Sequence, residues 1–216
     1  MNVYIDFDDC LCETALMFVK MAKKLFGKDI SYADMEYFDL QRTFSLSDEQ
    51  FGEMMRDGHT TEALLSIEEA KGASSVVNGW ISEGHTVSVI TGRPPSVYEA
   101  SRKWLDEHNL YGAKLYCFDK YGRDSFIKGS EFAALEPEEY FRMKFDFAVE
   151  DSPKAFKFLT HLPNLKVAVF DRPWNREHEF PNQNFIRCTD WEAVELEFEK
   201  HRQALLQVHA GRDRRY

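Results

Sequence analysis

The stretch that decides the fold is "VYIDFDDCLCE", residues 3–13, where a short apolar run ends abruptly at Asp6 and two further acids, Asp8 and Asp9, follow. The run over residues 2–6 has the length and apolar character of a buried strand. From Leu11 the apolar residues recur at helical spacing, and Gly27 is placed to end that helix. Carboxylates packed this closely repel one another, so we expect partners for them elsewhere in the chain.

Similar short apolar runs recur from residue 86 onward and predict strands over 86–90, 114–118, 146–150, 166–170 and 185–188. Helical patterns separate these runs, whereas residues from about 28 to 70 carry helical patterns and no strand. Alternation of strands and helices predicts an α/β fold, a Rossmann-like parallel sheet with helices on both faces. The strandless segment predicts a small helical insertion after the first strand.

Polar side chains stand where the predicted strands end: Asp6, Thr91, Glu150 with Asp151, and Asp171. In a parallel sheet these ends meet at one edge, which is where such sheets bind ligands. Clustered carboxylates suit Mg²⁺, which also accepts a substrate phosphate. A carboxylate beside that ion can attack phosphorus to give an aspartyl-phosphate, and a lysine would balance the remaining charge.

The charge and composition of the chain argue against several classes of function. The 216 residues include 27 Lys plus Arg and 37 Asp plus Glu, a formal net charge of −10, which argues against binding a nucleic-acid polymer. There is no apolar run of membrane-spanning length and no signal-peptide pattern, so we expect a cytoplasmic protein without membrane contact. The four cysteines form no spaced framework and are interpreted as reduced thiols.

Three motifs in order, "DFDDC" (6–10), "VSVITGR" (87–93) and "FAVEDS" (147–152), each lie at a predicted strand end. Together they resemble the motifs of haloacid-dehalogenase (HAD) superfamily phosphatases. More narrowly, "YADMEYFDL", "ITGRPP" and "VFDRPWN" resemble the 5′-nucleotidase C-type, deoxyribonucleotidase-like branch and its bacterial relatives. The resemblance covers most of the chain and implies a catalytic core over 1–14 and 69–216, with a helical cap over 15–68.

The resemblance assigns roles to the acids. It implies that Asp6 is the nucleophile and a Mg²⁺ ligand, and that Asp8 is the general acid and base and ligates the metal through its backbone carbonyl. Asp151 would ligate Mg²⁺ directly and Glu150 through water. Cys10 departs from the Thr or Val usual at that position, a change that conserves size.

The resemblance also implies a phosphate site in which Thr91 and the Gly92 N–H bind the phosphoryl group. A lysine completes this site in the family, and the sequence offers Lys120, Lys128 and Lys144. We favour Lys128, because it lies in an irregular stretch from which a side chain can reach in.

Further residues are candidates for substrate contact: Arg93, Tyr37, Phe38, Phe44 and Asn175. Each has a structural alternative. Arg93 can pair with a nearby acid, the aromatic residues can belong to the core of the insertion, and Asn175 can serve the turn in which it lies.

The resemblance implies a Mg²⁺-dependent phosphomonoester hydrolase acting through an aspartyl-phosphate, with a nucleoside monophosphate such as a deoxyribonucleotide as substrate. Alternatives are a phosphatase or phosphomutase acting on a sugar phosphate or another small metabolite, because fold does not fix substrate. A catalytically inactive phosphate-binding or receiver-like signalling module is the alternative of another class. The expected partner is a small phosphorylated substrate, and both a monomer and a homodimer remain open.

Overall fold

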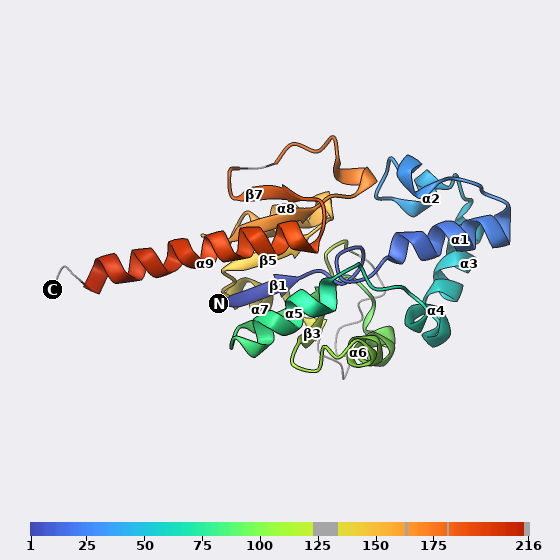
Figure 1. The fold of residues 1–216 in the computed structure, drawn as a ribbon. Coiled ribbons are helices and arrows are strands. Elements are labelled where there is room, and N and C mark those ends of the chain that lie inside the picture. Colours follow the sequence, from blue (N-terminus) through green and yellow to red (C-terminus); the bar gives the residue numbers. More distant parts are fainter. Residues whose placement is uncertain (123–133, 163, 181, 214–216) are drawn as a thin grey trace.

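A computed structural model describes residues 1–122, 134–162, 164–180 and 182–213 (Figure 1). Its strands form one parallel sheet in the order β4-β3-β2-β1-β5-β6-β7. The strands are β1 (Asn2–Ile5), β2 (Thr86–Thr91), β3 (Lys114–Phe118), β4 (Ala134–Leu135), β5 (Phe147–Glu150), β6 (Lys166–Phe170) and β7 (Phe185–Cys188). The predicted α/β fold class is confirmed, and the short edge strand β4 is an addition to it.

Strand β1 occupies the middle of the sheet, with Val3 paired to Val87 of β2 on one side and to Phe147 of β5 on the other. After β1, the chain adds β2, β3 and β4 on one side of it and then β5, β6 and β7 on the other side. This reversal opens a crevice beyond the carboxyl ends of β1 and β5, the usual ligand position in such sheets.

Helices cover both faces of the sheet. Alternate strand residues, such as Val3 and Ile5, pack with α5 (Ala73–Ser82), α6 (Tyr98–Glu107) and α9 (Trp191–Asp213). The residues between them, such as Tyr4, face α7 (Pro137–Arg142) and α8 (Pro153–Leu159). The period of two that places successive side chains on opposite faces therefore divides the core into two layers.

The insertion after β1 contains α1 (Thr14–Phe26), η1 (Tyr32–Asp34), α2 (Leu40–Thr43), α3 (Asp48–Gly58) and α4 (Thr61–Leu65). Helices α1 to α4 gather beyond the carboxyl end of β1 (Figure 1). They have an apolar cluster of their own, which includes Phe18, Phe44 and Met54. Leu64 of α4 instead packs with the main core. The division into a core over 1–14 and 69–216 and a cap over 15–68 stays a prediction.

The two connections to the insertion lie side by side. The Ala70 N–H donates to the Leu11 carbonyl at 2.8 Å, and the Glu13 N–H donates to the Glu68 carbonyl at 2.9 Å. The insertion is therefore joined to the sheet at one place, next to the crevice. In the described part of the chain, no helix combines the length and the apolar character needed to cross a membrane.

Candidate active site

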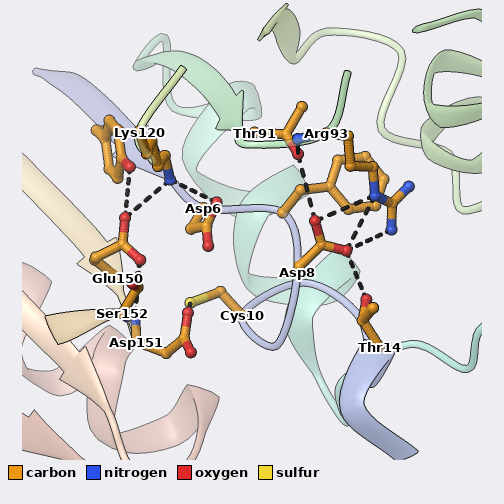
Figure 2. A network of polar contacts seen from close by, with 12 residues as sticks. Asp6, Asp8, Cys10, Thr14, Thr91, Arg93, Lys120, Glu150, Asp151 and Ser152 are labelled. Carbon is orange, nitrogen blue, oxygen red and sulfur yellow. Dashed lines mark hydrogen bonds and ion pairs between the residues drawn. The ribbon is translucent and has the colours of Figure 1, made fainter. Parts of the chain in front are cut away.

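Three strand ends bring a lysine between two acids (Figure 2). Asp6 follows β1, Glu150 ends β5, and Lys120 lies two residues after β3. The Lys120 ammonium donates to Asp6 Oδ1 at 2.7 Å and to Glu150 Oε2 at 2.9 Å. All three side chains are at most 4% exposed, so these ion pairs are shielded from water.

The lysine at this position is Lys120, whereas the sequence favoured Lys128. Lys128 lies outside the described residues. Lys144 is exposed, and its carbonyl accepts from the Asn2 side chain at the amino end of β1, the opposite end from the site. The rule that found the acids, a polar residue just beyond a strand end, also points to Lys120.

Glu150 is held by four hydrogen bonds. The Tyr4 hydroxyl donates to Oε2 at 2.6 Å beside Lys120, while the backbone N–H groups of Asp151 and Ser152 donate to Oε1 at 3.1 and 3.0 Å. These partners fix the Glu150 carboxylate beside Lys120.

The site carries more negative charge than one lysine offsets. Burial, followed by the charge of Glu150, raises the pKa of both Asp6 and Asp151 well above the usual value. Burial alone would lower the pKa of Lys120, but the charges of Asp6 and Glu150 outweigh it and raise that pKa well above its usual range. Buried carboxylates in excess of their counter-charges are the setting in which proteins hold a cation.

The donor atoms fit a divalent metal ion. Asp6, Cys10 and Asp151 are buried and offer ligand atoms within 4.8 Å of one another. The buried hydroxyl of Ser152, next to Asp151, has no hydrogen-bond partner among the described residues. Two carboxylates and a free hydroxyl suit Mg²⁺, which keeps several waters that need acceptors and donors. Burial raises the pKa of the Cys10 thiol, so it stays protonated in this structure.

Asp8 is held by Arg93. The guanidinium donates to Asp8 from Nη2 at 2.7 Å and from Nε at 3.0 and 3.2 Å, and the Thr14 hydroxyl donates to it at 2.6 Å (Figure 2). Arg93 also lies over the Phe7 ring. Burial by itself would raise the pKa of Asp8, but the charge and hydrogen bonds of Arg93 lower it below its usual value. Of the two interpretations weighed for Arg93, pairing with an acid is the one the structure has.

Thr91 ends β2, and Gly92 follows it at the same edge of the sheet. Thr91 is fully buried, and its hydroxyl oxygen accepts from the Arg93 N–H at 3.1 Å and lies 3.4 Å from Asp8. A Cβ at position 92 would lie 2.5 Å from the Tyr121 ring. Glycine at position 92 therefore lets this ring pack directly on the backbone beside the site.

A cavity of about 290 Å³ lies between these polar residues and the insertion. Asp6 and Asp8 are among its lining residues. The insertion contributes an apolar wall, which includes Met17, Phe18, Met35, Leu40, Phe51 and Met55. Three aromatic rings from separate segments also line the cavity: Phe38 lies 5.6 Å from Tyr121 and 6.3 Å from Trp174 between ring centroids.

Some of the predicted substrate contacts line the cavity, and others do not. Phe38 lines the cavity, whereas Tyr37 does not and lies under the Arg42 guanidinium at 3.5 Å. Phe44 is fully buried in the apolar cluster of the insertion, which agrees with its structural alternative as a core residue.

Asn175 serves the turn in which it lies, its structural alternative. It is fully buried, and its amide donates to the carbonyls of Asp151 and Phe170 at 2.8 and 2.9 Å. It therefore fixes the strand end that carries Asp151.

Comparison with known proteins places this geometry in context. No family model matches the chain. It is 23% identical to "Putative nucleotidase BH1399" of Halalkalibacterium halodurans over 188 residues, which cover 87% of each protein.

Solved structures share the fold. A "putative phosphoglycolate phosphatase" from Lactobacillus delbrueckii aligns with a TM-score of 0.60 at 10% identity, over 90% of this chain and 96% of that one. A HAD hydrolase of family IA from Entamoeba histolytica aligns with a TM-score of 0.52 at 13% identity, over 88% and 93%. The resemblance predicted from the motifs is therefore confirmed at the level of the fold: this chain shares its fold with a HAD hydrolase and with a "putative phosphoglycolate phosphatase". It is also similar over most of its length to a protein that carries the nucleotidase name.

Proposed function

We propose that this protein is a Mg²⁺-dependent phosphomonoester hydrolase that acts through an aspartyl-phosphate on Asp6, with a nucleoside monophosphate as substrate. The observation that carries the proposal is the buried Asp6–Lys120–Glu150 arrangement beside Asp151, at the carboxyl edge of a parallel sheet. A nucleophilic carboxylate needs a cationic surrounding to approach a phosphate dianion. Lys120 supplies part of this positive charge, and the remaining acids would hold a metal ion that supplies the rest.

Each residue then has a role. Asp6 and Asp151 would hold Mg²⁺ together with the Asp8 carbonyl, and Glu150 would act through water. Bound there, the ion offsets the repulsion between carboxylate and phosphate. The Asp6 carboxylate attacks phosphorus, while Lys120 stabilises the negative charge on the transferring group.

The leaving group and the attacking water need a proton donor and acceptor. In the first step the bond from phosphorus to the leaving oxygen breaks as the bond to Asp6 forms, and Asp8 protonates the leaving oxygen. In the second step Asp8 takes a proton from the water that attacks phosphorus, which releases inorganic phosphate and restores the Asp6 carboxylate. Thr91 and the Gly92 N–H hold the phosphoryl oxygens throughout. Because Arg93 favours the ionised form of Asp8, the proton-donating step requires that this pair loosens when substrate binds.

The cavity supports a nucleoside as the leaving group. Its wall also carries polar side chains such as Gln41 and His59, but it includes several apolar residues and the rings of Phe38, Tyr121 and Trp174. These rings suit a planar base better than a hydroxylated sugar. The similarity to a protein with a nucleotidase name agrees with this choice. The substrate would be a small phosphorylated molecule rather than a polymer.

The test is phosphate release from nucleoside monophosphates, sugar phosphates and an aryl phosphate. Activity should disappear with EDTA and return with Mg²⁺, and Asp6→Asn should abolish turnover and phosphorylation of the protein. Nucleotides should be preferred over sugar phosphates. Turnover that is indifferent to chelation would remove the metal from the proposal, and a preference for sugar phosphates would remove the nucleotide.

A further inference from the structure

Trp174 connects the candidate metal ligand to the wall of the cavity. It lies in η3 (Pro173–Asn175), directly beyond β6. Its indole Nε1 donates to Asp151 Oδ2 at 2.8 Å. The same ring lines the cavity and lies at 6.0 Å from Tyr32 and 6.3 Å from Phe38 of the insertion, both edge to face.

Asp151 is restrained at two points by consecutive residues. Asn175 holds its backbone carbonyl and Trp174 holds one side-chain oxygen. The other oxygen, Oδ1, lies 3.8 Å from the Cys10 thiol, among the candidate ligand atoms. The N–H of Trp174 thus fixes one carboxylate oxygen, and the other lies on the side of Cys10, the third member of the candidate ligand group.

The segment that carries Trp174 also contacts the insertion. Arg172 donates from Nε to the Asp9 carbonyl at 2.7 Å, from Nη1 to the Tyr32 hydroxyl at 3.0 Å, and forms an ion pair with Glu13. Residues 172–175 therefore touch the loop after β1, the strand end at Asp151 and the insertion together.

We propose that Trp174 is a positioning residue that orients Asp151 for the divalent cation while its ring forms part of the leaving-group cavity. This inference rests on the proposed function, since it concerns the metal site assigned there. Outer-sphere partners that orient a metal ligand are typically worth about 10–100-fold in metal affinity. Trp174→Phe removes the N–H and keeps an aromatic ring, so it separates the two roles.

The primary measurement is binding of Mn²⁺ alone to the protein without substrate, by electron paramagnetic resonance of the free ion. Trp174→Phe should weaken Mn²⁺ binding by about 10–100-fold. Phe38→Leu is the matched control: it alters the neighbouring ring, keeps the Trp174 N–H, and should leave Mn²⁺ binding unchanged.

Tryptophan emission gives a second readout. Trp80, Trp104 and Trp191 are at most 1% exposed, whereas Trp174 is half-buried at the site. Adding Mg²⁺ to the wild type should change the emission, and this change should be missing in Trp174→Phe. Trp174→Leu, which also lacks the N–H, replaces it if the phenylalanine variant does not fold.

The outcomes separate this inference from the proposed function. Unchanged Mn²⁺ affinity in Trp174→Phe, with affinity lost in Asp151→Asn, would overturn the role of Trp174 and leave the metal site standing. Equal Mn²⁺ binding by wild type and Asp151→Asn would overturn the metal site and this inference together. A lower melting temperature in Trp174→Phe without a change in Mn²⁺ affinity would show a merely structural role.

Discussion

Replacing Lys120 by methionine tests the centre of the site, because Met has a similar length but lacks the ammonium group with its charge and hydrogen-bond donors. In the wild type Lys120 pairs with two carboxylates at 2.7 and 2.9 Å, with every partner at most 4% exposed. Removing one member of a buried ion pair typically costs about 3–5 kcal/mol, since a charge is left buried without a partner. For a chain of this size that corresponds to a melting temperature lower by about 6–20 °C.

The direction of the pH dependence follows from the pKa of Lys120, which is raised in the folded state. Its stabilisation is fully present below the lysine pKa of the unfolded chain, about 10.4, and is lost only as the pH rises through the higher folded-state value. Measurements at neutral pH therefore record the full effect. In Lys120→Met the deficit should shrink in acid, because Asp6 has a raised pKa and becomes neutral there.

The assay is urea unfolding without metal, followed by turnover of an aryl phosphate with Mg²⁺. Turnover should fall by about 10²–10³-fold, the typical cost of one preorganised donor to a transition-state oxyanion. Lys144→Met is the matched control, because Lys144 is exposed at the opposite end of the sheet, and Lys128→Met tests the lysine favoured from the sequence. Lys120→Met/Glu150→Gln should recover part of the lost stability. Lys120→Met indistinguishable from Lys144→Met in both measurements would refute the reasoning.

Asp8 pairs with Arg93, and the Arg93 side chain is only 3% exposed. Asp8→Asn should therefore lower the unfolding free energy by about 3 kcal/mol at neutral pH, because it leaves the arginine charge buried without a partner. Adding Arg93→Met should restore most of the lost stability. The pKa of Asp8 is lowered in the folded state. The stabilisation from the Asp8–Arg93 pair is therefore present above the unfolded pKa of about 3.9 and is lost as the pH falls through the folded value. A stability difference between wild type and Asp8→Asn that grows in acid would contradict this. In the insertion, Phe44→Ala should cost about 3–5 kcal/mol of stability without a selective change in KM. Phe38→Ala should leave stability nearly unchanged but weaken nucleotide binding by about 1–3 kcal/mol, and equal KM values for both variants would remove Phe38 from the substrate site.

The sequence predicted the positions of Asp6, Thr91, Glu150 and Asp151 correctly relative to the strand ends, because apolar runs and the polar residues that end them are local features. A parallel sheet then converts chain positions far apart into one edge. Lys120 obeys the same rule and was recoverable from it.

Local sequence patterns do not predict contacts that long side chains make between distant segments. The pairing of Arg93 with Asp8 and the hydrogen bond from Trp174 to Asp151 join segments whose separation in space depends on how the turns after each strand are built. Phe38 and Phe44 show the same limit. They are six positions apart in a segment of short helices, and only the packing of the insertion makes one a wall of the cavity and the other part of its core.

The paired connections at 11–13 and 68–70 have a consequence for how such a chain diversifies. Because the polypeptide leaves and re-enters the sheet through neighbouring backbone segments, the residues between them form a loop whose ends already meet. Its length and sequence can change with little strain on the sheet, as with insertions at closely spaced chain ends in other domains. Selection, or a protein engineer grafting a foreign segment between Ala15 and Glu68, can therefore exchange the apolar wall of the cavity while Asp6, Lys120 and Glu150 stay in register.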